Sequence, residues 1–142
     1  MSVYADTSFI ASLYIPDANS PCAAKIMQVL PLPVMLTQFG ELEFVNALHL
    51  RLFRKEMRQA EVRATHAAFR ADLHAGVFAV HALPDAAFTH ALRLAAKWTV
   101  RLGTRSLDII HVAAAVVLHA DTFQTFDDRQ RALAKAAKLK AG

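Results

Sequence analysis

Short apolar runs alternate with longer amphipathic segments along the whole chain. We expect strands in the short runs Ser2–Ala5, Val34–Thr37, Val77–Val80 and Thr122–Phe126. We expect helices in the segments Phe9–Ile15, Pro21–Leu30, Phe39–Lys55, Gln59–Leu73, Asp85–Leu102, Leu107–His119 and Asp127–Lys138. The repeated order of strand and helix predicts an α/β fold with a parallel sheet.

The first strand begins so close to residue 1 that we expect it in the middle of the sheet, with later strands added on both sides. The ending Leu139–Gly142 leaves little material for a fifth strand, so the sheet is predicted to have four to five strands. Gly103 is expected to end the helix before it.

The composition indicates one ordered domain covering residues 1–142, because 55% of the residues are hydrophobic and only 20% are charged. No apolar run is long enough to span a membrane, and the N-terminus lacks a signal-peptide pattern. The only cysteine, Cys22, is interpreted as a small buried residue of a protein in the reducing cytoplasm. The formal charge of +4 favours an anionic partner, with nucleic acid as the first choice.

Four acidic residues fall at equivalent places in this order of elements. Asp6 and Asp127 directly follow the first and fourth strands, and Glu43 lies early in the helix after the second strand. Asp108 lies in the first turn of a helix that we expect Ser106 to cap. Helix capping is an alternative role for Asp108 and Asp127, whereas Asp6 and Glu43 are not convincing caps. All four are expected at the carboxyl edge of the sheet, where sites form in open α/β folds.

Clustered carboxylates repel one another, so protonation or a bound cation must offset their charge. Oxygen ligands select hard ions such as Mg²⁺ or Mn²⁺, which hold phosphates and activate water. A basic protein with an acidic pocket therefore indicates a metal-dependent hydrolase acting on nucleic acid.

Two neighbouring pairs of acids compete for these places. Glu41 and Glu43 lie about 200° apart on a helix, so only one of them can face the site. We prefer Glu43, which shares a face with Asn46. Asp127 is preferred over Asp128 because it directly follows the strand.

Four segments of this chain resemble motifs of the PIN-domain ribonucleases of the VapC type, toxins of type II toxin–antitoxin systems. The segments are Tyr4-Ala-Asp6-Thr7-Ser8, Glu43-Phe-Val-Asn46-Ala-Leu, Ser106-Leu-Asp108-Ile-Ile-His111-Val-Ala-Ala-Ala and Thr125-Phe-Asp127-Asp-Arg-Gln. Each motif alone is weak, but all four occur in the family's order and spacing.

The resemblance implies a three-layer α/β/α sandwich and cleavage of RNA that depends on Mg²⁺ or Mn²⁺. It implies that Asp6, Glu43, Asp108 and Asp127 form the catalytic, metal-binding tetrad. Ser8, Asn46 and Thr125 would support it. It also implies a homodimer and a cognate antitoxin that binds DNA.

Basic and histidine side chains have weaker assignments. RNA or antitoxin contact is one interpretation of Arg105, Arg54, Lys55 and Arg58, and a solvated surface is the other. His111 follows Asp108 by three residues in an apolar helix and is predicted to be a packed, hydrogen-bonded side chain.

Two other functions are compatible with parts of the pattern. A PIN-like module could bind RNA or protein without cutting. A receiver domain also holds Mg²⁺ at strand ends, but Asp6 has no acidic neighbour and no lysine follows Phe126 closely.

Overall fold

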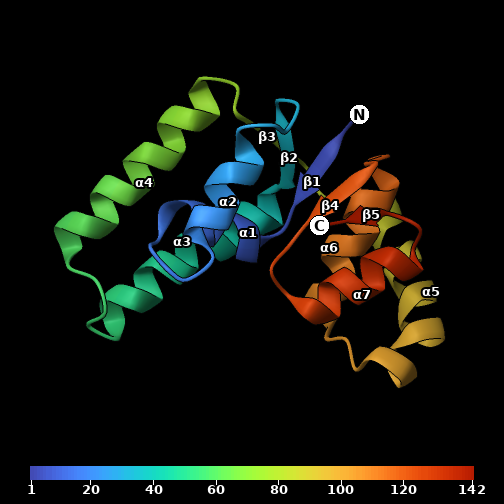
Figure 1. Cartoon of the computed structure of the whole chain (residues 1–142). Coiled ribbons are helices and arrows are strands. Elements are labelled where there is room, and N and C mark those ends of the chain that lie inside the picture. Colours follow the sequence, from blue (N-terminus) through green and yellow to red (C-terminus); the bar gives the residue numbers. More distant parts are fainter.

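The computed structural model describes all residues from 1 to 142 and contains one five-stranded parallel sheet (Figure 1). The strands are β1 (Val3–Ala5), β2 (Val34–Thr37), β3 (Phe78–His81), β4 (Thr122–Gln124) and β5 (Lys140–Ala141). The helices are α1 (Thr7–Tyr14), α2 (Ser20–Met27), α3 (Gln38–Phe53), α4 (Gln59–His74), α5 (Asp85–Leu102), α6 (Ser106–Val117) and α7 (Asp128–Ala136). None of these helices combines the length and the apolarity that crossing a membrane requires.

The strand order β3-β2-β1-β4-β5 places the first strand in the centre, as predicted. Tyr4 of β1 is in register with Met35 of β2 on one side and with Phe123 of β4 on the other. The chain builds the sheet outward from β1 to β3, then returns to the opposite side of β1 for β4. The fifth strand exists but has only two residues, which agrees with the short segment available for it.

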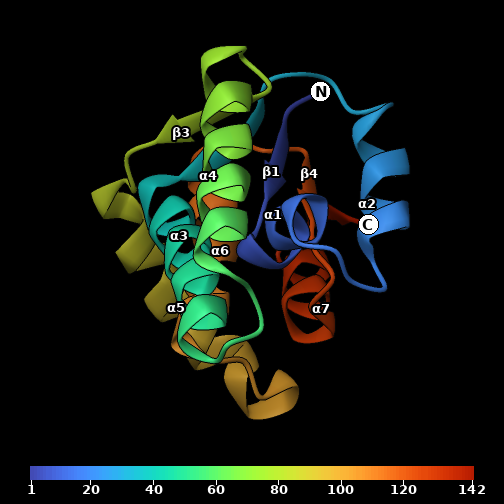
Figure 2. The same cartoon turned by 90° about the vertical axis from the view of Figure 1, so that its left-hand side faces the viewer.

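Helices cover both faces of the sheet, so the fold is the expected three-layer α/β/α sandwich. Val3 and Ala5 of β1 pack among residues of α1 to α4, whereas Tyr4 packs among residues of α5 to α7. This alternation follows from the period of two along a strand. Figures 1 and 2 show α1 to α4 on one side of the sheet and α5 to α7 on the other.

Helix ends differ in part from the expectations. Gly103 ends α5 with a positive φ of 63°, as predicted. Asp6 is the N-cap of α1, accepting a hydrogen bond from the Phe9 N–H, so the judgement that it is no convincing cap was wrong. Arg105 rather than Ser106 takes the N-cap position of α6, because the helix begins one residue earlier than its apolar pattern.

Cys22 is exposed, so the prediction that it is buried was wrong. It lies in the first turn of α2, and its neighbour Ala23 is the residue of that helix that is buried. A single apolar face is enough for a short helix on the surface of the sandwich, and Cys22 lies outside that face.

Candidate active site

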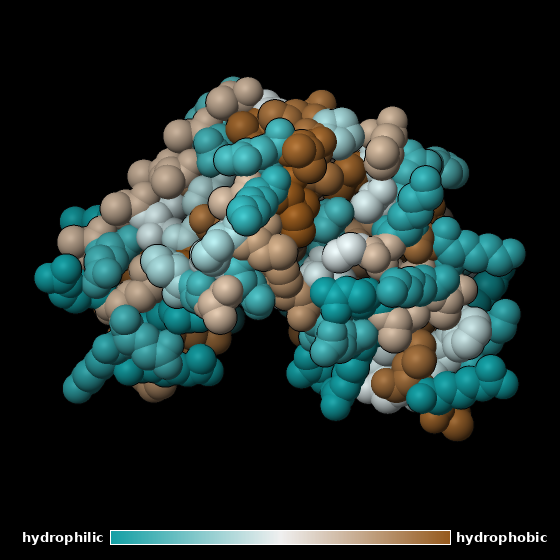
Figure 3. Space-filling view, in the orientation of Figure 1, coloured by the Kyte–Doolittle hydropathy of each residue, from teal (hydrophilic) through white to brown (hydrophobic).

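The carboxyl edge of the sheet is hollowed between β1 and β4, where the strand order reverses. The space-filling view shows the molecule indented there, between the part formed by α3 and α4 and the part formed by α6 and α7 (Figure 3). A cavity of about 280 Å³ at this edge is lined by Thr7, Glu43, Arg105, Leu107, Asp108, His111 and Gln130. Ligands bind at this place in open α/β sheets.

Asp6 directly follows β1 and is completely buried beside the cavity rather than lining it. One carboxylate oxygen accepts hydrogen bonds from Ser8 Oγ (2.7 Å) and the Phe9 N–H (3.0 Å), and the other accepts one from Thr125 Oγ1 (2.6 Å). Burial raises the pKa of Asp6 above its ordinary value, because desolvation outweighs these hydrogen bonds. Ionised Asp6 is therefore a charge that the surrounding protein stabilises only in part.

Glu43 reaches the cavity from α3 and is held by two side chains on other elements. Thr7 Oγ1 donates to Glu43 Oε1 at 2.5 Å, and His111 Nε2 contacts the same oxygen. Burial raises the pKa of Glu43, but the hydrogen bonds from His111 and Thr7 outweigh it, so the pKa lies below its ordinary value. Glu43 is thus held in its ionised form facing the cavity.

His111 of α6 connects this carboxylate to the core. Its Nδ1 lies 2.8 Å from the Tyr4 hydroxyl, and the side chain is almost completely buried. An imidazole protonated on Nε2 satisfies both contacts, because it donates to Glu43 and accepts from Tyr4. His111 is packed and hydrogen-bonded, and it also orients Glu43, which the sequence did not indicate.

Asp108 also lines the cavity, from the first turn of α6, with only 3% of its side chain exposed. Its Oδ2 accepts from the backbone N–H of Arg105 (3.0 Å) and from Arg105 Nε (3.3 Å). Its Oδ1 accepts from Gln130 Nε2 at 3.3 Å. Asp108 therefore contributes to capping α6, as predicted, and also lines the cavity.

Asp127 flanks the cavity without lining it. Its Oδ1 caps α7 by accepting from the Gln130 N–H, and its Oδ2 lies 3.9 Å from an Arg105 guanidinium nitrogen. Its backbone N–H donates to Thr125 Oγ1, the hydroxyl that also contacts Asp6. Asp128 is 93% exposed and pairs with Arg131, so Asp127 is the acid beside the site.

The other predicted residues lie at differing distances from this cavity. Glu41 lines a separate surface pocket, so Glu43 alone of the two faces the site. Asn46 is exposed and makes no hydrogen bond to Glu43. Arg54, Lys55 and Arg58 are exposed around the turn between α3 and α4, and Arg58 pairs with Glu61. Among the basic residues, only Arg105 lines the cavity.

Sequence reasoning did not assign Thr7 or Gln130 to the site, although both line the cavity. Gln130 is 8% exposed, and its Oε1 is buried without a hydrogen-bond partner. A signal existed in the spacing, since Gln130 follows Asp127 by three residues and so lies one helical turn away. Which way a helix turns that residue depends on packing, which spacing alone does not specify.

Solved structures of known proteins share the fold of this chain. VapC20 of Mycobacterium tuberculosis, a sarcin–ricin loop cleaving toxin, is 22% identical with a TM-score of 0.70, covering 97% of this chain and 96% of that chain. FitAcB from Neisseria gonorrhoeae is 17% identical with a TM-score of 0.71, covering 98% and 95%. A toxin–antitoxin complex from Klebsiella pneumoniae is 13% identical with a TM-score of 0.64, covering 92% and 91%. At these identities the likeness shows a shared fold.

Among curated proteins, none is significantly similar to this chain. A model of the PIN domain family matches residues 3–136, which is nearly the whole sequence and includes all four acids of the site. The chain therefore belongs to the PIN-domain family.

Proposed function

We propose that this protein is a metal-dependent endoribonuclease of the VapC type, the toxin component of a type II toxin–antitoxin system, acting as a single domain of residues 1–142. The observation that carries the proposal is the cavity at the sheet edge, which is lined by Glu43 from α3 and by Asp108 from α6. Membership of the PIN family supports it, and so does the RNA-cleaving activity named for VapC20.

The donor groups around the cavity fit a hard divalent cation such as Mg²⁺ or Mn²⁺. The carboxylates supply only oxygen, and the buried Gln130 Oε1 lacks a partner that a water molecule on such an ion would provide. No three His, Cys, Asp or Glu side chains are close enough together to enclose an ion by themselves. This arrangement suits Mg²⁺, which keeps several waters and uses few carboxylates.

In the proposed mechanism, Glu43 and Asp108 would hold the cation, and Asp6 and Asp127 beside the cavity would complete the acidic tetrad. When bound, such an ion polarises the scissile phosphate and lowers the pKa of the attacking water. Ser8 and Thr125 keep Asp6 in place through its two oxygens. No nucleophilic side chain beside a base is required, so hydrolysis proceeds without a covalent enzyme intermediate.

Substitution of Glu43 tests this function against a matched neighbour. Glu43→Gln removes one carboxylate from the cavity, and we expect RNA cleavage in Mn²⁺ to fall roughly a hundredfold. Glu41→Gln removes the same charge two residues away, outside the cavity, and should leave the rate within about twofold of wild type. The measurement is the initial rate of cleavage of purified transfer and ribosomal RNA. Equal rates for wild type and Glu43→Gln would favour the alternative, a PIN-like module that binds RNA or protein without cutting.

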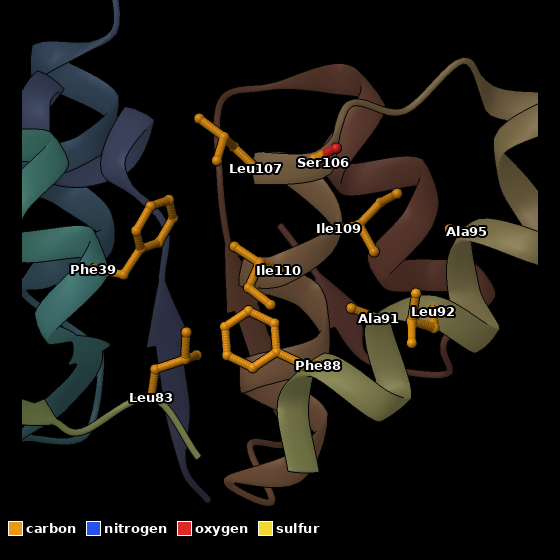
Figure 4. Close-up of a pocket in the computed structure, with 10 residues that line it drawn as sticks. All are labelled: Phe39, Leu83, Phe88, Ala91, Leu92, Ala95, Ser106, Leu107, Ile109 and Ile110. Carbon is orange, nitrogen blue, oxygen red and sulfur yellow. The ribbon is translucent and has the colours of Figure 1, made fainter. Parts of the chain in front are cut away.

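We propose two partners besides RNA, in a cytoplasmic setting. A cognate DNA-binding antitoxin of the VapB type is supported by the toxin–antitoxin complex among the similar structures. A second copy of the chain is supported by an apolar cavity of about 450 Å³ beside α5 and α6, where Phe88 lies next to Ile110 (Figure 4). The large apolar side chains at its rim, Phe88, Leu92 and Leu107, are each more than half exposed. Clustered apolar exposure of this kind marks protein interfaces.

Charge placed on this apolar rim tests the homodimer. Leu92→Glu should raise the dimer dissociation constant roughly a hundredfold, because a twofold interface loses each apolar contact twice. Val100→Glu is the matched control, since Val100 is 94% exposed on the same helix but does not line the cavity. Sedimentation equilibrium measures both variants. A monomeric wild type, or a Leu92→Glu dimer as tight as wild type, would contradict the proposed homodimer.

A further inference from the structure

Arg105 forms ion pairs with acids of the candidate site. It is the only lysine or arginine that pairs with any of the four acids, and it pairs with two of them, Asp108 and Asp127. Its guanidinium thus supplies a single positive charge that lies 3.3 Å from one carboxylate and 3.9 Å from the other. Carboxylates that share one guanidinium are close enough to repel each other, and the positive charge offsets part of that repulsion.

The Arg105 side chain is exposed to solvent, whereas the Asp108 carboxylate with which it pairs is buried. The Arg105 side chain is 68% exposed, and that of Asp108 is 3% exposed. Ion pairs with one long, solvated partner contribute little to stability, so the guanidinium can leave at small cost. Asp108 would then remain held by Gln130 Nε2 on its other oxygen and by the backbone N–H of Arg105.

The guanidinium contacts an oxygen of Asp108, the carboxylate of α6 that lines the cavity. Asp108 Oδ2 accepts from Arg105 Nε, and Asp127 Oδ2 is the oxygen closest to the guanidinium. Arg105 lines the cavity together with Glu43 and with Gln130, whose buried Oε1 has no partner. A guanidinium on Asp108 Oδ2 and a divalent cation in the cavity would therefore compete for the same carboxylate charge.

We propose that Arg105 is a resident counter-ion that neutralises Asp108 and Asp127 before a divalent cation binds, and that its displacement sets the affinity for that cation. This inference rests on the proposed metal-dependent function and adds a residue that opposes metal binding. Arg105 is here a positioning residue that acts through the two carboxylates. Its loss should make metal binding tighter and the metal-free protein only slightly less stable, because the ion pair is exposed.

Mn²⁺ binding to the full-length protein, followed by titration calorimetry and by electron paramagnetic resonance, tests this role. We expect Arg105→Gln to bind Mn²⁺ roughly 3- to 10-fold more tightly than wild type, since one competing charge is removed. Arg105→Lys keeps the charge and should bind like wild type. Arg101→Gln is the control for net charge alone. The Arg101 side chain, in the last turn of α5, packs on Trp98 and contacts none of the four acids. In EDTA, Arg105→Gln should also unfold at a lower temperature than Arg101→Gln.

The Asp108→Asn variant distinguishes a wrong role for Arg105 from a wrong metal site. If Asp108→Asn loses Mn²⁺ binding while Arg105→Gln and Arg101→Gln bind equally, Arg105 does not compete with the metal, although the metal site stands. If wild type does not bind Mn²⁺, or if Asp108→Asn binds it as wild type does, the proposed metal site is wrong and the role of Arg105 is wrong with it. Tighter binding confined to Arg105→Gln supports the inference.

Discussion

Asp108→Asn is expected to reduce RNA cleavage by roughly a thousandfold while the protein remains folded. The side chain is almost completely buried on the wall of the cavity, and it is the only acidic side chain of α6. Asparagine has the same shape, and its amide oxygen still accepts a hydrogen bond from the backbone N–H of Arg105. The substitution therefore removes a negative charge from the site with little change in packing.

Asp128→Asn is the control for this variant, since it makes the same chemical change at an acid that is 93% exposed and paired with Arg131. We expect this control to cleave within about twofold of wild type. Initial rates in Mn²⁺ and circular dichroism spectra of all three proteins provide the comparison. A rate for Asp108→Asn within tenfold of wild type, with an unchanged spectrum, would exclude Asp108 from the catalytic tetrad.

Asp6→Asn is expected to have opposite effects on activity and on stability. Cleavage should fall roughly a hundredfold or more, because a carboxylate of the tetrad is lost. In EDTA, however, the melting temperature at neutral pH should rise by a few degrees. Burial makes ionised Asp6 costly, and the asparagine side chain would keep an oxygen for the Phe9 N–H and leave no charge to desolvate.

The pH dependence of this gain has a definite sign. The pKa of Asp6 is raised in the folded protein above its ordinary value of 3.8, so the folded state binds more protons than the unfolded state between those two values. Stability of the wild type therefore falls as pH rises through this window, and the advantage of Asp6→Asn grows over the same range. Thermal unfolding in EDTA from pH 4 to pH 7 measures it.

Asp17→Asn provides a control of opposite sign. Burial raises the pKa of Asp17, but hydrogen bonds from Ser12, Asn19 and Ser20 together outweigh it, so the pKa lies below its ordinary value. Its charge therefore stabilises the fold above the ordinary pKa, and its removal should lower the melting temperature at neutral pH. Mn²⁺ should raise the melting temperature of wild type and of Asp17→Asn by more than that of Asp6→Asn, because Asp6 contributes charge to the acidic tetrad beside the cation. A lower melting temperature for Asp6→Asn at pH 7 in EDTA would contradict the cost assigned to burial.

The order of elements and the position of the acids followed from the sequence because both depend on local rules. The spacing at which apolar residues recur distinguishes strands from helices. Parallel strands place their carboxyl ends at the same edge of the sheet. Asp6, Glu43, Asp108 and Asp127 were therefore predictable at that edge. Helical geometry also explains why Glu43 and Glu41 face different surfaces.

The contacts that connect these acids were not predictable in the same way. His111 and Glu43 are 68 residues apart, and Thr125 and Asp6 are 119 apart. Such pairs depend on how far each helix is rotated and shifted against the sheet, which side-chain packing decides. Local spacing accordingly identified His111 as a packed residue but did not reveal its contact with Glu43.

By itself, then, the sequence determined an α/β fold with a central first strand and an acidic edge. Only the tertiary structure decided how the acids are partnered: Asp6 buried as a helix cap, Asp108 between Arg105 and Gln130, and Cys22 on the surface. The physical reason is that backbone periodicity specifies which face of an element is apolar. The environment of each polar side chain depends instead on residues that packing brings from elsewhere in the chain.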